Sequence, residues 1–220
     1  MRNFYLFSLL LLLAFTANAQ FEKGQKLVGP GIRFNVNSQT NKPDVGTEQT
    51  NKVFGVNLLV SSIKMKTQSV GWGYSAGWGI QHQKDENGTN VGKTTNNNFT
   101  VGVIRRQYIN LIPKLFVFID AGLQANWGTG KTTFTSNNNK AESTNNQLGT
   151  QIYASPGVSF FLNKKLLLDA QLNQLAAIGY VRNTSENNGS KNSNQSVFAN
   201  SNLSAGSLLN SFNFSLKWVL

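Results

Sequence analysis

The sequence predicts an all-β fold, an eight-stranded antiparallel up-and-down barrel, on two observations. Eight segments alternate apolar with small or polar residues at a period of two, which is the period of a strand with one apolar face. The connections between these segments alternate between long and short, so every long connection leaves the same end of the meander. An even strand number with this loop asymmetry is typical of membrane barrels with short periplasmic turns and long extracellular loops.

The first segment of the chain indicates export. Met1-Arg2-Asn3 is basic, the run from Phe4 to Phe15 is apolar, and Ala17-Asn18-Ala19 has the small-x-small pattern of a cleavage site. The apolar run is shorter than the roughly 20 residues that a transmembrane helix needs. We therefore predict a signal peptide at 1–19 and an outer-membrane β-barrel domain at 20–220. Gln20 is not a cysteine, so we expect no lipid anchor.

The clearest strand pattern covers Val70–His82. One face would carry Val70, Trp72, Tyr74, Ala76, Trp78, Ile80 and His82, while the other would carry mainly glycine. Leu115–Trp127 sets apolar residues at odd positions against Asp120, Gly122, Gln124 and Asn126. The other predicted strands, in chain order, are 25–36, 53–63, 98–110, 147–162, 166–181 and 211–220.

The predicted connections fall into two classes. Long polar ones lie at about 37–52, 83–97, 128–146 and 182–206, and short ones at about 64–69, 111–114 and 163–165. Both ends of the barrel domain would then lie at the short-turn side, which is periplasmic in a membrane barrel.

The apolar faces are predicted to point outward, toward lipid. The opposite faces are rich in Gly, Ser and Asn, which suit the narrow interior of an eight-stranded barrel but weaken a water-exposed strand. Aromatic residues on the apolar faces lie near the strand ends, as in the two girdles of a membrane barrel. Trp72 and Trp218 fall toward the short turns, and Trp78, Trp127 and Tyr180 toward the long loops. A soluble barrel with its apolar face inward is the alternative.

Several stretches resemble a known family. Ser155–Ala170 resembles the strand–turn–strand signature of the small outer-membrane β-barrels of Gram-negative bacteria, of the OmpX or OmpA transmembrane-domain type. Arg106-Gln107-Tyr108 and Leu115–Phe118 are similar to it as well. The resemblance implies an eight-stranded transmembrane barrel and contact with the outer-membrane assembly machinery during biogenesis. The final Lys217-Trp218-Val219-Leu220 departs from the family's pattern, because the aromatic residue lies two places before the end.

Five charged residues are predicted to face the barrel interior: Arg33, Arg106, Asp120, Asp169 and Lys217. A charge inside a dry barrel must be paired or it costs several kcal/mol. We therefore expect an internal salt-bridge network. Acid–base catalysis by the two aspartates is the less favoured interpretation, because their strands are not neighbours in the meander.

Composition excludes other classes of site. The chain has no cysteine and one histidine, which excludes a disulfide scaffold, a zinc–thiolate site and a multi-histidine metal site. We expect no cofactor and no metal. The formal net charge of +11 invites a nucleic-acid interpretation. However, the bases gather at the short-turn end without interleaved aromatics, and an exported chain does not meet nucleic acid. A rim of this charge suits anionic lipid head groups.

The leading functional hypothesis is a monomeric, non-enzymatic outer-membrane barrel. Its lumen would be plugged by side chains, and its polar loops would serve surface interaction or envelope integrity, with a loop partner that the residues do not identify. A narrow pore is one alternative. A lipid-modifying enzyme that uses His82 is another, although no serine stands two places on and no acid shares its face. Gly128–Thr133 has the tail of a phosphate-binding loop but lacks its spacing.

Overall fold

The computed structural model describes residues 21–41, 49–88, 90–136, 139–172, 174–187, 190–201 and 212–220, so the predicted signal peptide lies outside it. The described residues form ten antiparallel strands in one sheet. No helix among them is long and apolar enough to cross a membrane. The strands are β1 (Lys26–Asn41), β2 (Gln49–Met65), β3 (Val70–Asn87), β4 (Asn90–Ile112), β5 (Leu115–Ser136), β6 (Asn139–Asn163), β7 (Leu166–Leu172), β8 (Ala176–Asn187), β9 (Ser190–Ser201) and β10 (Phe212–Val219).

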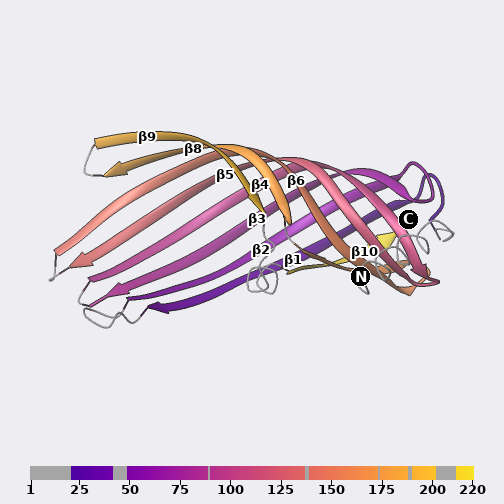
Figure 1. Cartoon of the computed structure of the whole chain (residues 1–220), viewed down its shortest axis with the longest axis horizontal. Helices are drawn as coiled ribbons and strands as arrows, with labels where there is room; N and C mark the ends of the chain where they lie inside the picture. Colours follow the sequence, from indigo (N-terminus) through magenta and orange to yellow (C-terminus); the bar gives the residue numbers. More distant parts are fainter. Residues whose placement is uncertain are drawn as a thin grey trace, which may run out of the picture.

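Eight of these strands close a ring of hydrogen bonds. β1 to β7 each pair with the next strand along the chain, except that β7 pairs with β10, and β10 returns to β1. The closure places Leu27 opposite Val219. Beside it, Lys26 and Leu220 each donate their backbone N–H to the other's carbonyl oxygen at 2.9 Å. β10 therefore lies beside β1 at the short-turn end (Figure 1).

The strand predicted at 166–181 is in fact two strands, so the sheet has more than the eight predicted. β7 ends at Leu172, β8 begins at Ala176, and Gln174 between them has a φ of 47°. β7 pairs with the part of β6 nearest the short turn, and β8 pairs with residues 143–154 of β6. β9, predicted as loop, forms a hairpin with β8. Among the described residues, the ring is therefore complete only in its short-turn half.

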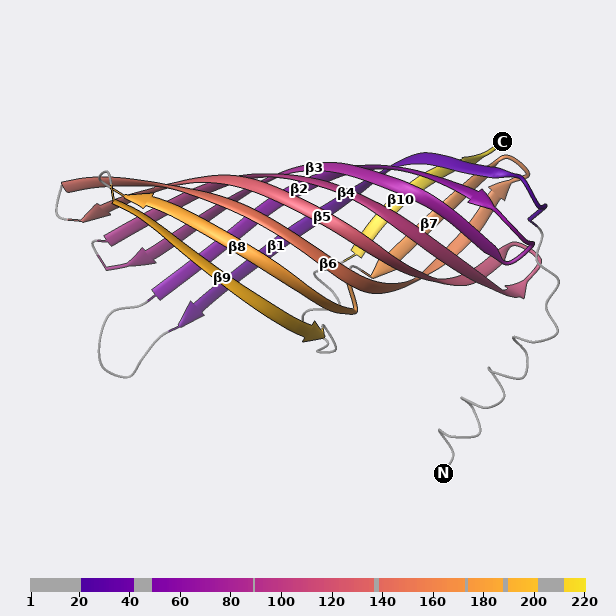
Figure 2. The same ribbon diagram turned by 90° about the horizontal axis from the view of Figure 1, so that it is seen from above.

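The predicted long loops are largely β-structure. β4, β5 and β6 contain 23, 22 and 25 residues, whereas a membrane crossing takes roughly 9–11. Pairing between β3 and β4 continues to Asn87 opposite Asn90, and between β5 and β6 to Ser136 opposite Asn139. The strands therefore run on as hairpins toward the end away from the C-terminus (Figure 2). The short turns lie where they were predicted, with 66–69, 113–114 and 164–165 between strands.

The alternating faces point as predicted, with the apolar side outward. Leu123 on β5 is 52% exposed and Ile152 on β6 is 66% exposed, whereas the inward Asp120 is 2% exposed. The same alternation runs along β3, where Trp72, Tyr74 and Trp78 are exposed and the glycines between them face inward. An exposed apolar surface that encircles the sheet is far larger than the patches that soluble monomers carry.

Inside the ring, an aromatic side chain covers a glycine on the neighbouring strand. Phe118 on β5 lies opposite Gly157 on β6. A Cβ at Gly157 would lie 2.4 Å from Cζ of Phe118 and 2.8 Å from the carbonyl oxygen of Ala170. The ring therefore occupies the space that any other residue at 157 would need. An aromatic ring also shields the backbone at such a glycine.

We predict that Gly157→Ala destabilises the folded barrel by about 1–3 kcal/mol, because Phe118 must leave its position. The matched control is Gly92→Ala, where the nearest atom to an added Cβ lies at 3.6 Å, an ordinary contact. The free energy of unfolding from urea titrations in detergent would measure both. Equal stability of the two variants would contradict the packing described here.

Candidate functional site in the barrel lumen

An apolar plug fills the lumen at the short-turn end. The Phe21 ring lies 4.5 Å from that of Tyr108, 5.2 Å from Phe116 and 5.3 Å from Phe161, measured between centroids. Phe21 is 1% exposed, so the first described residue is buried inside the barrel. Together with these four aromatics, the plug contains Leu27, Ile63, Met65, Phe118, Leu167 and Val219.

The plug escaped the sequence prediction, which assigned small and polar residues to the lumen. Leu115–Ile119 is apolar at both parities, so its alternation does not distinguish Phe116 and Phe118, which point inward, from Val117 and Ile119. Phe160 and Phe161 pose the same ambiguity on β6. The signal available was the run itself, because consecutive apolar residues mark a strand that is buried on both faces.

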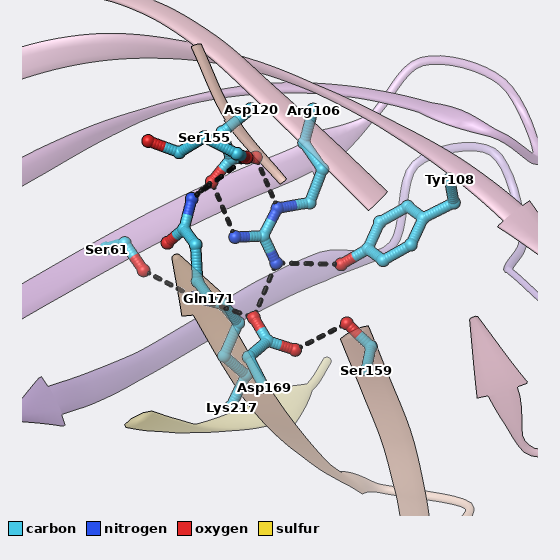
Figure 3. Close-up of polar contacts among 9 residues, drawn as sticks. All are labelled: Ser61, Arg106, Tyr108, Asp120, Ser155, Ser159, Asp169, Gln171 and Lys217. Atoms are coloured by element: carbon cyan, nitrogen blue, oxygen red, sulfur yellow. Dashed lines mark hydrogen bonds and ion pairs between the residues drawn. The ribbon is translucent and has the colours of Figure 1, made fainter. Parts of the chain in front are cut away.

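A buried ion-pair network lies directly above the plug, built on Arg106 from β4 (Figure 3). Arg106 donates from Nε and Nη2 to the two carboxylate oxygens of Asp120, at 2.6 and 2.7 Å. Its Nη1 donates to Oδ2 of Asp169 at 2.5 Å. Arg106 thus joins two carboxylates from β5 and β7 across the lumen. All three side chains are about 3% exposed or less.

Further donors surround the two carboxylates. Asp169 accepts a hydrogen bond from Oγ of Ser159 at 2.6 Å, and Nζ of Lys217 on β10 lies 3.4 Å from its Oδ2. Lys217 also donates to Oγ of Ser61 at 2.8 Å. Asp120 accepts a hydrogen bond from Nε2 of Gln171 at 2.8 Å. The network contains two cations and two carboxylates, so it carries no net charge.

The network rests on the aromatic plug. The guanidinium carbon of Arg106 lies 3.7 Å from the centroid of the Phe118 ring, which is close enough for a cation–π interaction. Nη1 of Arg106 also donates to the hydroxyl of Tyr108 at 3.1 Å. Gly157, Phe118 and Arg106 therefore form one stack from the barrel wall toward the middle of the lumen.

Arg33 lies apart from this network, although it was predicted within the same group. It sits on β1 opposite Asn57 and Asn213, and its Nε donates to Oδ1 of Asn213. Within the described part of the chain, no ion pair joins Arg33 to a carboxylate. Four of the five predicted interior charges therefore meet in one network, and Arg33 faces the polar space above it.

That space is a polar vestibule above the network. A cavity of about 90 Å³ touches Arg106, Asp120 and Lys217, and Arg33 also lines it. A larger vestibule of about 590 Å³ follows toward the hairpin end, again with Arg33 in its wall. The lumen thus has three layers: the apolar plug, the ion-pair network and the vestibule.

The five predicted girdle residues all lie on the outside. Trp72, Trp78, Trp127, Tyr180 and Trp218 are 38–49% exposed. Trp78, Phe99 and Trp127 are register neighbours across β3, β4 and β5, and the Phe99 and Trp127 rings stack at 5.0 Å with an interplanar angle of 16°. Phe99 was not among the residues singled out from the sequence.

His82 has a partner that sequence spacing did not suggest. Its Nδ1 lies 3.0 Å from Oγ1 of Thr95, the residue opposite it on β4. The described residues place no carboxylate in an ion pair or hydrogen bond with this imidazole. Gly128–Thr133, the stretch with a phosphate-loop tail, lies within β5 and opens no helix.

Comparisons with known proteins find similarity of fold. No family model matches the chain, and neither does any curated protein. Among solved structures, the chain is similar to Ail, the attachment invasion locus protein of Yersinia pestis, with a TM-score of 0.38 and 13% identity over 90% of this chain and 99% of that one. A major outer membrane protein from Thermus thermophilus gives a TM-score of 0.45 and 12% identity over 89% of this chain and 99% of that one.

The translocator domain of the autotransporter NalP from Neisseria meningitidis gives a TM-score of 0.36 and 10% identity over 99% of this chain and 94% of that one. Each of these three neighbours shares no more than 13% identity with the chain. At these TM-scores they carry no inference about function, which we draw from the residues of this chain.

We predict that Asp169→Asn lowers the free energy of unfolding by about 3–5 kcal/mol, because it leaves Arg106 and Lys217 buried with one carboxylate. The control Glu186→Gln, on an exposed position of β8, should change stability by less than about 0.5 kcal/mol. Adding Lys217→Met to Asp169→Asn restores charge balance and should recover part of the loss. A cost for Asp169→Asn no larger than that of Glu186→Gln would contradict the network's role.

Proposed function

We propose that the chain is a non-enzymatic outer-membrane β-barrel protein with a closed lumen, whose projecting hairpins serve surface interaction or envelope integrity. The observation that carries this proposal is the reversed polarity of the barrel. Large apolar side chains cover the outside, whereas paired charges lie buried inside. A soluble barrel would place these two groups the other way round.

The height of the apolar surface supports a membrane position. On β3, the outward apolar residues run from Val70 to Ile80, a distance of ~34 Å along a strand. At the strand tilt of membrane barrels, this corresponds to a band ~25 Å tall, the height of their apolar belts. Lys84 follows on the same face of β3, so a charge marks the upper limit of the band.

Both rims of this band have side chains that suit contact with lipids. Trp72 and Trp218 lie toward the short turns, and Trp78, Trp127 and Tyr180 lie toward the hairpins, where amphipathic rings meet lipid head groups. The short-turn rim also presents exposed bases, each worth about 1 kcal/mol near an anionic surface. They are Lys23, Lys26, Lys64, Lys66, Arg105, Lys114, Lys164 and Lys165.

The hairpins beyond the band supply the surface for interaction. An ion pair crosses one of them: Glu142, near the start of β6, contacts Nζ of Lys131 on β5 at 2.7 Å, and it also contacts Nζ of Lys140 on its own strand at 2.8 Å. These pairs are exposed, and the two lysines hold the pKa of Glu142 down to about 2, far below its usual value near 4.5. Glu142 therefore stays ionised at any pH well above this lowered value.

A pore requires the plug and the network to part. Every side chain of the plug is buried. The network above it links β4, β5, β7 and β10 across the lumen. We therefore expect no stable unitary conductance steps when the purified protein is inserted in planar bilayers. Stable steps in proportion to the amount of inserted protein would favour the pore alternative.

The membrane position has a direct test in single substitutions. Leu123 lies between Ile119 and Trp127 on the outward face of β5, near the middle of the band. We predict that Leu123→Arg lowers the free energy of unfolding in lipid vesicles by about 2–4 kcal/mol, because it places a charge at the bilayer midplane. The matched control is Thr133→Arg, on the same strand face but in the projecting hairpin.

The control should retain near-native stability and the gel mobility of an unheated, folded barrel. Equal losses from the two arginines, or a folded Leu123→Arg variant that stays in the aqueous fraction, would contradict a membrane position.

A further inference from the structure

Among the described residues, Arg33 is a charge in the lumen without a counter-charge. The ion-pair network is neutral without it, and no carboxylate among the described residues pairs with it. Its Nε donates a hydrogen bond to Oδ1 of Asn213, and no hydrogen bond in the described structure involves Nη1 or Nη2. These two groups carry four N–H donors, arranged as a planar fork that matches a carboxylate. A partly buried cation of this kind is stabilised by an anion that supplies the missing charge.

The space beside Arg33 is built for a hydrophilic molecule. Among the described residues that line the vestibule, eight are Asn or Gln, including Asn57, Gln81, Asn98, Gln124 and Gln151, and Arg33 is the only charged one. Carboxamides both donate and accept hydrogen bonds, so they suit hydroxyl groups, which do the same. The volume of about 590 Å³ lies within the range of small-molecule sites.

An aromatic ring supplies part of an apolar wall, which Val181 also lines. Phe198 on β9 lines the vestibule, and its ring covers Gly179 on β8. The combination of one guanidinium, several carboxamides and a ring matches a molecule with one carboxylate, several hydroxyls and an apolar ring face. A monosaccharide acid has these groups.

We propose that Arg33 and the vestibule carboxamides bind a small polyhydroxylated carboxylate, a sugar acid such as glucuronate, that enters from the hairpin end. The carboxylate pairs with Nη1 and Nη2 of Arg33, and the hydroxyls pair with the carboxamides. The site is closed below by the ion-pair network, so it holds its ligand and does not pass it through. Binding needs the folded barrel but not a conducting or interacting one, so it stands separately from the proposed function.

Isothermal titration calorimetry on the full folded chain in detergent tests the proposal, with sodium glucuronate as the probe. Glucose, which lacks the carboxylate, and sodium chloride, which lacks the hydroxyls, are the comparison ligands. We expect Arg33→Gln to weaken glucuronate binding at least about tenfold, because it removes a charge-assisted bidentate pair. Arg33→Lys keeps the charge but loses the fork, so we expect an intermediate affinity.

The matched control is Arg182→Gln. Arg182 lies exposed on the outward face of β8 and donates to Oγ of Ser193, so its loss removes the same charge from the other side of the barrel wall. It should bind glucuronate as the unchanged protein does. Heat-modifiable gel mobility establishes that each variant is folded.

Four outcomes would overturn the proposal: no glucuronate binding, glucose binding as tight as glucuronate, chloride competing at equal affinity, or equal loss in Arg33→Gln and Arg182→Gln. None of these outcomes bears on membrane insertion, which the Leu123→Arg comparison measures independently.

Discussion

The contact on which the rest of the lumen depends is that of Arg106 with two aspartates from different strands. An eight-stranded ring leaves an interior only wide enough for side chains, so each group inside must find its partner there. Arg106 satisfies both carboxylates and lies on Phe118, which in turn needs the bare backbone of Gly157. Loss of any member leaves an unpaired buried charge or a displaced ring. The packing and the electrostatics of the lumen therefore depend on the same few contacts.

The alternating pattern predicted the barrel's inside and outside because the two faces of each strand differ so strongly in polarity. The outer face carries Leu123 and Ile152, and the crowded lumen carries Gly122 and Ser155, so parity alone separates them. The pattern also placed Arg106, Asp120, Asp169 and Lys217 inside. It did not separate Arg33 from them, because parity gives the side of the sheet and carries no information about height along the lumen.

The remaining differences have physical causes as well. Strands rich in Thr and Asn beyond the apolar band are polar on both faces, so they lack the contrast that marks a strand, and β9 was predicted as a loop. Strand segments that are apolar on both faces also lack this contrast, so the sequence pattern did not predict the plug around Phe116. The break at Gln174 depends on its positive φ and on the hydrogen bond from its backbone N–H to Oγ of Ser155, 2.9 Å long. A local sequence pattern does not predict such a tertiary contact.

The closure between β1 and β10 has a consequence for the order in which the barrel forms. Leu27 and Val219 lie opposite each other although almost the whole domain separates them in sequence. Contacts of such separation are slow to form, because a long loop must close before they contribute. Until β10 arrives, β1 and β7 both present unpaired edges, which are templates for pairing with other chains. The chain is thus most open to aggregation between synthesis of its first and last strands. The barrel closes only when β10 pairs with both edges.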